Sequence, residues 1–255
     1  GVLIRVDGIP SKGYAVMTDN ASALRAQEAP VSIDEKHVET RFLKVELNEN
    51  GHFISIYDKQ EKRELLKPGE EGNVLVTYED RPHNFDAWDI NNYYTEKSWD
   101  VDCVTEMTVE ERGPLRYAIR IGYKYLSSVI VQHLYFYPDK ARFDIKNEVD
   151  WKEKQILLKD WFPVDIHTSE ATYEIQFGNV KRPTHYNTSW DYARFEVCAQ
   201  KWIDISEDGY GLSILNDCKF GYSVHDGRIG LTMLKSAIYP NPDADKERHK
   251  FTYAF

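Results

Sequence analysis

Several features that define other protein classes are absent from this chain of 255 residues. It has no block of Lys and Arg, and its formal net charge is −10 with a pI near 5.3. Nucleic acids and anionic membranes carry dense negative charge, so an acidic chain binds them poorly. No apolar run is long enough to span a bilayer, and residues 1–20 lack the layout of a signal peptide. We therefore expect neither nucleic acid nor a membrane as partner.

Cysteine is scarce and unpatterned. The three cysteines, Cys103, Cys198 and Cys218, are scattered and show no CxxC spacing. An odd, scattered set favours free thiols over a disulfide framework. The sequence predicts free, mostly buried thiols in a reducing compartment, and hence a cytoplasmic protein.

Helical periodicity over a dozen residues is also missing, and alternating apolar and polar residues take its place. Asn48-Glu-Asn-Gly51 and Asp226-Gly227 separate such runs, and both are strong hairpin signals. Many strands without βαβ alternation indicate an all-β antiparallel sandwich of large sheets with very little helix. The expected strands are residues 42–47, 52–57, 73–78, 103–111, 115–126, 129–137, 141–151, 155–164, 171–177, 193–197, 211–215, 221–224, 228–234 and 251–255.

A domain boundary is expected near residue 30. Residues 1–30 contain short apolar runs, a strand-like segment at 2–6 and a linker at 18–30 that ends at Pro30. We assign them to the remainder of a preceding small β region, and residues 31–255 to the sandwich. Chain ends are more often polar and frayed than strand-like. Strand-like residues at both ends suggest a piece of a longer protein.

Known catalytic and metal-binding motifs are absent as well. The chain has no HxH, HxxxH or HExxH pattern, no GxSxG and no P-loop. The nearest approaches to a metal cluster are His83 with Asp80 and Asp86, and His185 with Asp191, and such pairs are usually surface residues. We therefore predict no metal site and no catalytic residue in this chain.

The most informative stretch is residues 78–90, which combine acidic, aromatic and histidine side chains between expected strands. A polar and aromatic loop on a β scaffold is a common place for function. Phe85 and Trp88 can stack on a sugar ring, and Asp86 and Asp89 can accept hydrogen bonds from hydroxyl groups. In the alternative interpretation the aromatic rings fill the core and the acids are solvated.

Two further stretches contain weaker candidates. Residues 176–191 look like a long connection without a strand, and contain His185, Asn187 and Asp191. Residues 210–222 place Asn216, Asp217 and Lys219 directly after an apolar strand. The structural alternatives are an Arg182–Asp191 pair that fixes the first loop, and a turn or β-bulge that satisfies backbone groups in the second.

Taken in order, several motifs resemble one known family. Those that carry the resemblance are residues 6–14, 51–58, 78–90, 182–191, 195–197, 210–222 and 245–253. Together they resemble the C-terminal region of the glycoside hydrolase family 38 α-mannosidases, with the microbial and cytosolic branch nearer. The resemblance covers nearly the whole chain.

The resemblance implies a galactose-mutarotase-like β super-sandwich and a parent protein that hydrolyses α-mannosides with retention. In the family, the zinc ligands, the aspartate nucleophile and the general acid lie on an N-terminal catalytic domain. That domain is absent here, so zinc is expected there and no cofactor is expected in this chain. The expected partners are the catalytic domain of the parent chain and a mannose-containing oligosaccharide. This expectation is also compatible with a parent protein that forms an oligomer.

The family loop that matches residues 85–89 approaches the active site and helps to wall the sugar pocket. The resemblance therefore implies accessory substrate-binding roles for Asp86, Trp88 and Asp89, in a domain that is inactive alone. Two alternatives stay open. One is an independent carbohydrate-binding module, and the other is a mutarotase-like epimerase, for which His83 and His185 are the available histidines.

Overall fold

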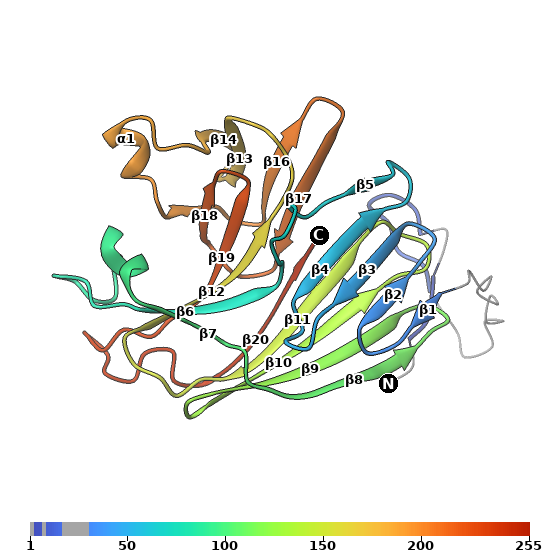
Figure 1. Ribbon diagram of the computed structural model, residues 1–255, viewed down its shortest axis with the longest axis horizontal. Helices are drawn as coiled ribbons and strands as arrows, with labels where there is room; N and C mark the ends of the chain where they lie inside the picture. The colour runs from blue at the N-terminus through green and yellow to red at the C-terminus, as the bar shows by residue number, and fades with distance from the viewer. Residues whose placement is uncertain (1–2, 7–8, 17–30) are drawn as a thin grey trace.

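The computed structural model describes residues 3–6, 9–16 and 31–255. These residues form three β-sheets in which every strand pair is antiparallel (Figure 1). Within the described residues, helix is limited to the short 3₁₀ helix η1 (Asn92–Glu96) and to α1 (Ser189–Tyr192). The prediction of an all-β antiparallel super-sandwich with very little helix is confirmed.

The first sheet is a meander of five strands in sequence order. Its strands are β1 (Ser32–Ile33), β2 (His37–Glu39), β3 (Leu43–Leu47), β4 (Phe53–Asp58) and β5 (Arg63–Glu64). The predicted Asn-Gly turn joins β3 to β4. There the N–H of Gly51 donates to the carbonyl of Asn48 at 3.1 Å.

The second sheet has nine strands and forms the common layer of the molecule. In spatial order they are β14 (Gly178–Pro183), β13 (Glu170–Ile175), β16 (Trp202–Glu207), β17 (Tyr210–Asn216), β20 (Arg248–Ala254), β11 (Phe143–Asp150), β10 (Ser128–Phe136), β9 (Tyr117–Tyr125) and β8 (Val104–Arg112).

The third sheet has six strands. In spatial order they are β15 (Val197–Cys198), β18 (Gly221–His225), β19 (Arg228–Lys235), β12 (Ile156–Pro163), β6 (Val74–Glu79) and β7 (Ser98–Asp100). The predicted Asp226-Gly227 turn joins β18 to β19. Both turn residues have positive φ, +47° and +67°, as a two-residue hairpin turn requires.

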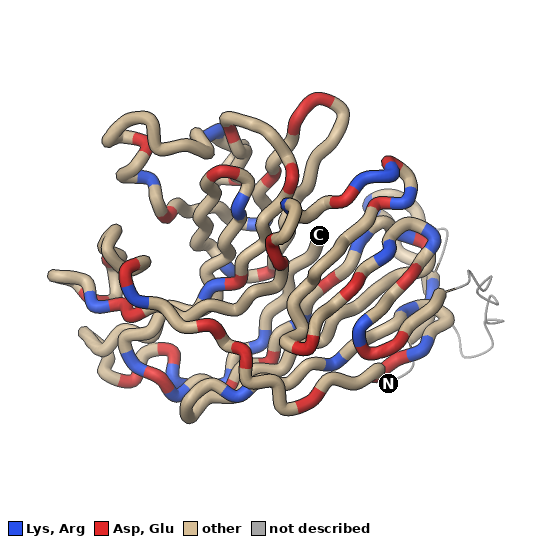
Figure 2. The backbone as a smooth tube through the Cα atoms, viewed as in Figure 1, with Lys and Arg blue, Asp and Glu red and all other residues tan. Residues whose placement is uncertain are grey.

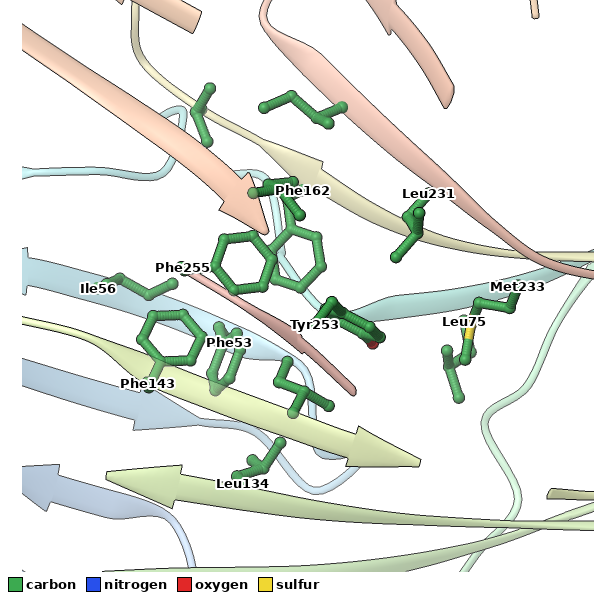
Figure 3. Packing of buried hydrophobic residues seen from close by; sticks show 14 of the residues in the cluster. Phe53, Ile56, Leu75, Leu134, Phe143, Phe162, Leu231, Met233, Tyr253 and Phe255 are labelled. Atoms are coloured by element: carbon green, nitrogen blue, oxygen red, sulfur yellow. The ribbon is translucent and has the colours of Figure 1, made fainter. Parts of the chain in front are cut away.

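Aromatic side chains join the sheets. Phe53 of β4 meets Phe143 of β11 with ring centroids 5.4 Å apart, and Phe162 of β12 meets Phe255 at 4.2 Å. Figure 3 shows these rings packed together with Ile56 and Tyr253. Burial of each such side chain contributes about 1.5–3 kcal/mol. Two smaller sheets thus share one continuous core with the nine-stranded sheet.

A buried polar chain crosses this core. The Oε1 of Gln132 accepts from Asn73 at 2.9 Å, and its Nε2 donates to Asn147 at 3.1 Å and to the hydroxyl of Tyr253 at 3.3 Å. All four residues are at most 1% exposed. Buried polar groups are costly unless paired, so this chain favours one relative position of the three sheets.

Most predicted strands are confirmed within one or two residues at their ends. The strand expected at 193–197 is wrong apart from Val197, because Thr188 and Asp191 form a capping box that begins α1 just before it. Residues 178–183 form β14, where a connection without a strand was expected. The short strands β1, β2, β5 and β7, and also β16, were not predicted.

Two further expectations are wrong, and a third falls on residues that the structure does not describe. Residues 3–6 form no strand, against the expectation for 2–6, and the expected linker at 18–30 lies outside the described residues. The three cysteines are free as expected, but all are exposed, so the prediction of mostly buried thiols is wrong. Cys103 and Cys218 lie just outside strands, where the core does not reach.

Candidate functional site

A cleft of about 510 Å³ opens on the six-stranded sheet between η1 and α1. Figure 1 shows η1 and α1 at the same end of the molecule, near the antiparallel strands β6, β12, β18 and β19. Six of the residues that line the cleft are Phe, Tyr or Trp, and they come from β6, η1, β12 and residues 186–195. Clefts of this size and character are typical small-ligand sites.

The floor of the cleft is held in place by hydrogen bonding and by close packing. The indole N–H of Trp161 on β12 donates to the hydroxyl of Tyr78 on β6 at 2.9 Å. Gly230 on β19 lies opposite Trp161, and a Cβ there would stand 2.8 Å from the indole. Glycine therefore lets the indole lie against the sheet.

The two walls of the cleft come from different segments. Tyr94 of η1 meets Tyr78 edge to face at 5.0 Å and Phe195 at 6.1 Å. On the other side, Tyr186 and Tyr192 meet edge to face at 5.4 Å. The side-chain amide of Asn92 donates to the hydroxyl of Tyr192 at 3.3 Å, which joins η1 to α1.

A fully buried lysine lies beneath these rings. The Nζ of Lys159 on β12 donates to Oε2 of Glu196 at 2.5 Å, to the hydroxyl of Ser223 at 2.8 Å and to that of Thr232 at 3.0 Å. Burial lowers the pKa of Lys159, and the carboxylate of Glu196 opposes that shift. A buried ion pair is retained in proteins only when well hydrogen-bonded, and this pair satisfies that condition.

Charged residues of both signs stand at the rim of the cleft. Arg228 pairs with Glu70 at 2.9 Å, and the Nδ1 of His52 contacts Glu71 at 2.7 Å. Asp100 of β7 adds a third carboxylate. Figure 2 shows Lys and Arg interspersed with Asp and Glu along the chain. The rim therefore has no strong excess of positive charge.

The phenols of Tyr78 and Tyr94 remain protonated at neutral pH. Burial raises the pKa of Tyr78 to about 12, and burial raises the pKa of Tyr94 further still. Both hydroxyl groups therefore act as neutral hydrogen-bonding groups rather than as proton acceptors for catalysis.

Asp86, Trp88 and Asp89 lie in the loop between β6 and η1, outside the cleft. The Oδ2 of Asp86 accepts from the backbone N–H of Ile238 at 2.6 Å. Trp88 is 68% exposed and Phe85 is 67% exposed, so neither ring fills the core. Asp89 is exposed, and within the described residues its carboxylate makes no hydrogen bond or ion pair.

His185, Asn187 and Asp191 lie together before and within α1. The Oδ2 of Asp191 accepts from the N–H and hydroxyl of Thr188, at 3.1 and 2.8 Å, and lies 3.7 Å from the Nδ1 of His185. The N–H of Asn187 donates to the same imidazole nitrogen at 3.4 Å. In this structure Asp191 caps the start of the helix, and the His185 side chain accepts from the backbone of Asn187 just before it.

Asn216, Asp217 and Lys219 hold the end of β17. Asn216 is buried; its amide donates to the carbonyl of Gln200 at 2.8 Å, and its Oδ1 accepts from the N–H of Lys219 at 2.6 Å. The Oδ2 of Asp217 accepts from the N–H of Thr252 at 3.0 Å. The ammonium of Lys219 lies 4.2 Å from the Phe251 ring centroid, and burial lowers its pKa.

Several segments that carry exposed apolar and aromatic side chains lie at the end of the molecule that carries η1 and α1 (Figure 1). Hydrogen bonds link its segments: Asn92 to Tyr192, and Ile238 to Asp86. We call this surface the aromatic end. It comprises Phe85, Trp88, Tyr93, Trp190, Ile238 and Tyr239, while Tyr186 and Tyr192 beside it line the cleft.

The described part of the chain offers no group of three or more His, Cys, Asp or Glu side chains placed to hold a metal ion. His83 is exposed, and Asp80 is buried and paired with Lys235. Burial raises the pKa of Asp80, although Lys235 opposes this. Within the described ranges no helix is long and apolar enough to span a membrane.

Sequence reasoning missed most of the cleft. It singled out neither Tyr94 nor Trp161, it used Phe195 only as part of the motif 195–197, and it left Lys159 unremarked inside an expected strand. One signal was available in the sequence. Lys159 interrupts the largely apolar run Leu157-Leu-Lys-Asp-Trp-Phe162. Lysine is almost never fully buried unless it is paired, so its presence there points to an unusual environment.

The fold and the site define an all-β super-sandwich domain with an aromatic cleft. The profile described as "Glycosyl hydrolases family 38 C-terminal domain" matches residues 38–243. The chain belongs to this family.

Several α-mannosidases are similar to the chain in sequence. Alpha-mannosidase G of Dictyostelium discoideum is 36% identical over 100% of this chain and 25% of its own length. Human alpha-mannosidase 2C1 is 37% identical over 96% of this chain, and the Saccharomyces cerevisiae alpha-mannosidase is 39% identical over 71% of it. The chain spans about a quarter of the length of the first two.

Solved structures show the same fold. A glycosyl hydrolase family 38 protein from Enterococcus faecalis matches with a TM-score of 0.74 at 14% identity, over 91% of this chain and 31% of that protein. An alpha-mannosidase from Enterococcus faecalis V583 matches with a TM-score of 0.71 at 15% identity, over 86% of this chain and 29% of that protein. At these identities the likeness concerns the fold.

Proposed function

We propose that this chain is the C-terminal β domain of a zinc-dependent retaining α-mannosidase. It supports hydrolysis of α-mannosides by packing on the catalytic domain and walling its sugar pocket, and it is inactive alone. The family membership and the α-mannosidase relatives support this proposal. The zinc ligands and the catalytic carboxylates lie on the catalytic domain, and the enzyme works in the cytoplasm on mannose-containing oligosaccharides.

The aromatic end is the single observation that carries the packing role. Trp190 is 77% exposed, Trp88 68% and Tyr239 63%. Large aromatic side chains gathered on one exposed surface mark an interaction site, and Trp and Tyr are enriched in interfaces. The catalytic domain of the parent chain is the partner that this surface fits.

Trp88 and Asp89 are suited to walling a sugar pocket at that interface. Both side chains project from a loop at the aromatic end and are exposed. The indole offers an apolar face for a sugar ring, and the Asp89 carboxylate, unused within the described residues, offers acceptors for hydroxyl groups. Asp86 supports the loop through its bond to Ile238.

The test is the replacement Asp89→Ala in the complete enzyme. Substrate affinity or turnover on an aryl α-mannoside should fall about tenfold while the melting temperature is unchanged, because only an interaction with substrate or with the reacting site is lost. Glu35→Ala is the matched control, since Glu35 is also an exposed acid but lies in the β1–β2 turn. A loss of thermal stability without loss of kcat/KM would contradict the wall role.

A further inference from the structure

We propose that the cleft between η1 and α1 is a carbohydrate-binding site of this chain itself, which takes a neutral mono- or disaccharide. This site is separate from the sugar pocket that Trp88 and Asp89 are proposed to wall, because neither residue lines the cleft. The inference concerns only residues within this chain, and it does not depend on the catalytic domain.

The lining of the cleft suits a sugar. The rings of Trp161 and Tyr192 offer apolar surface to the C–H groups of a pyranose ring, whereas the ring of Tyr186 already stacks on His225 with centroids 3.9 Å apart. Around the rings stand groups that both donate and accept hydrogen bonds, among them the exposed hydroxyls of Thr95 and Ser98 and the amide of Asn92. A volume of about 510 Å³ has room for one or two hexose rings.

A cationic ligand is the first competitor, because aromatic cages also bind ammonium groups. Here the Nζ of Lys159 already lies 5.9 Å from the Tyr94 ring centroid and 5.4 Å from that of Trp161. These two rings therefore already interact with a cation, the ammonium group of Lys159. Because Lys159 is paired with Glu196, the two together leave no net negative charge beneath the rings to hold a second cation.

An anionic ligand is the second competitor. Arg228 is the one Lys or Arg among the residues that line the cleft, and it already pairs with Glu70. Glu71 and Asp100 add negative charge at the same rim. A phosphate or carboxylate would meet more negative than positive charge, so a neutral polyhydroxyl ligand is the class that remains.

The cleft is also organised before any ligand arrives. The Trp161 indole is held by its bond to Tyr78 and by the space above Gly230, and Tyr192 is held by Asn92. Ser223 is fixed by Lys159 and Glu196 from below. Side chains that are ordered in advance lose little conformational entropy on binding, which favours affinity for a small ligand.

The experiment is a titration of the ¹⁵N-labelled 255-residue chain with methyl α-D-mannopyranoside, followed by NMR. The reporter is the indole N–H resonance of Trp161, assigned by its loss in Trp161→Phe. We expect a saturable shift of this resonance. Tyr192→Ala should weaken binding about tenfold, because one stacking face is removed. Trp190→Ala should leave binding within about twofold, since Trp190 lies on the same helix but does not line the cleft.

Three results would overturn the inference. The first is a Trp161 resonance that sugar does not move. The second is a resonance that tetramethylammonium or inorganic phosphate moves in preference to sugar. The third is equal binding by the Tyr192→Ala and Trp190→Ala chains. Because this chain holds no partner domain, failure of the proposed role in hydrolysis would leave the titration unchanged, and the two proposals fail separately.

Discussion

The backbone N–H of Ile238 donates a hydrogen bond to Oδ2 of Asp86 across 152 positions of sequence. This bond ties the loop between β6 and η1 to the segment that follows β19. Asp86 and Asp89 are three positions apart and look equivalent in the sequence. In the structure one carboxylate holds the fold, and the other is free of hydrogen bonds and ion pairs within the described residues.

Asp86→Ala should therefore lower the stability of the fold, whereas Asp89→Ala should leave it unchanged. Loss of the bond to Ile238 is expected to lower the free energy of unfolding by about 1 kcal/mol. Amide hydrogen exchange should speed up at Ile238, which loses its acceptor. Urea unfolding of both variants checks the first part, and equal stabilities for the two would contradict this division of roles.

The Lys159–Glu196 pair predicts strong coupling in stability. Lys159→Met leaves the carboxylate of Glu196 without its ammonium partner, and should lower the free energy of unfolding by about 3–5 kcal/mol. Glu196→Leu should be similarly harmful. The double variant should be markedly more stable than the sum of the two losses implies, because no unpaired charge remains buried. A double-mutant cycle from chemical unfolding measures this coupling, and simple additivity would refute it.

Asp160 predicts a pH dependence of stability near neutrality. It lies in the core, where burial raises its pKa to about 7 from an ordinary 3.8, although the hydroxyl of Tyr253 donates to it. Its Oδ1 has no hydrogen-bond partner within the described residues. The folded state thus binds the proton more tightly than the unfolded state, so this group's contribution is fully present below pH 3.8 and is lost as pH rises through 7.

Asp160→Asn isolates that contribution, because the amide oxygen still accepts from Tyr253 and carries no charge. The difference in unfolding free energy, variant minus wild type, should grow from about pH 4 to pH 7 and level off above it. Urea unfolding across this range measures the difference. A difference that is constant with pH would show that Asp160 keeps the same proton affinity in both states.

Gly230 predicts a steric effect on the cleft. An alanine Cβ would stand 2.8 Å from the Trp161 indole and 3.0 Å from Cε of Lys159, so one of them must move. Overpacking of this kind should cost about 1–3 kcal/mol. The Trp161 indole N–H resonance should shift as its bond to Tyr78 is disturbed. If Gly230→Ala changes neither the Trp161 resonance nor the free energy of unfolding, the indole is not closely packed against position 230.

The fold class was predictable because the signals for it are local. The alternation along residues 117–125 predicts one apolar face, and Ile119, Ile121 and Tyr123 are buried as that pattern requires. The Asn-Gly and Asp-Gly turns likewise depend only on backbone preferences of the turn residues. Strands as short as β5 and β7 contain too few residues for a pattern, and only neighbouring strands decide that they form.

The cleft was not predictable for a related reason. Trp161 and Tyr78 are 83 positions apart, and they meet only because β12 pairs with β6. Lys159 and Glu196 are likewise brought together by tertiary structure. By contrast, the stretch 78–90 was noticed because its unusual residues are adjacent in sequence, and that adjacency does not reveal that Asp86 is used by the fold.

The central claim is that this chain packs on a catalytic domain and supports hydrolysis of α-mannosides. The most direct measurement expresses the N-terminal part of the parent enzyme alone and assays it on an aryl α-mannoside with and without the 255-residue chain. The account predicts that adding the chain raises kcat/KM at least about tenfold, since it completes the sugar pocket, and that a Trp88→Asp chain fails to do so. An N-terminal part that is fully active alone and unaffected by the chain would contradict the account.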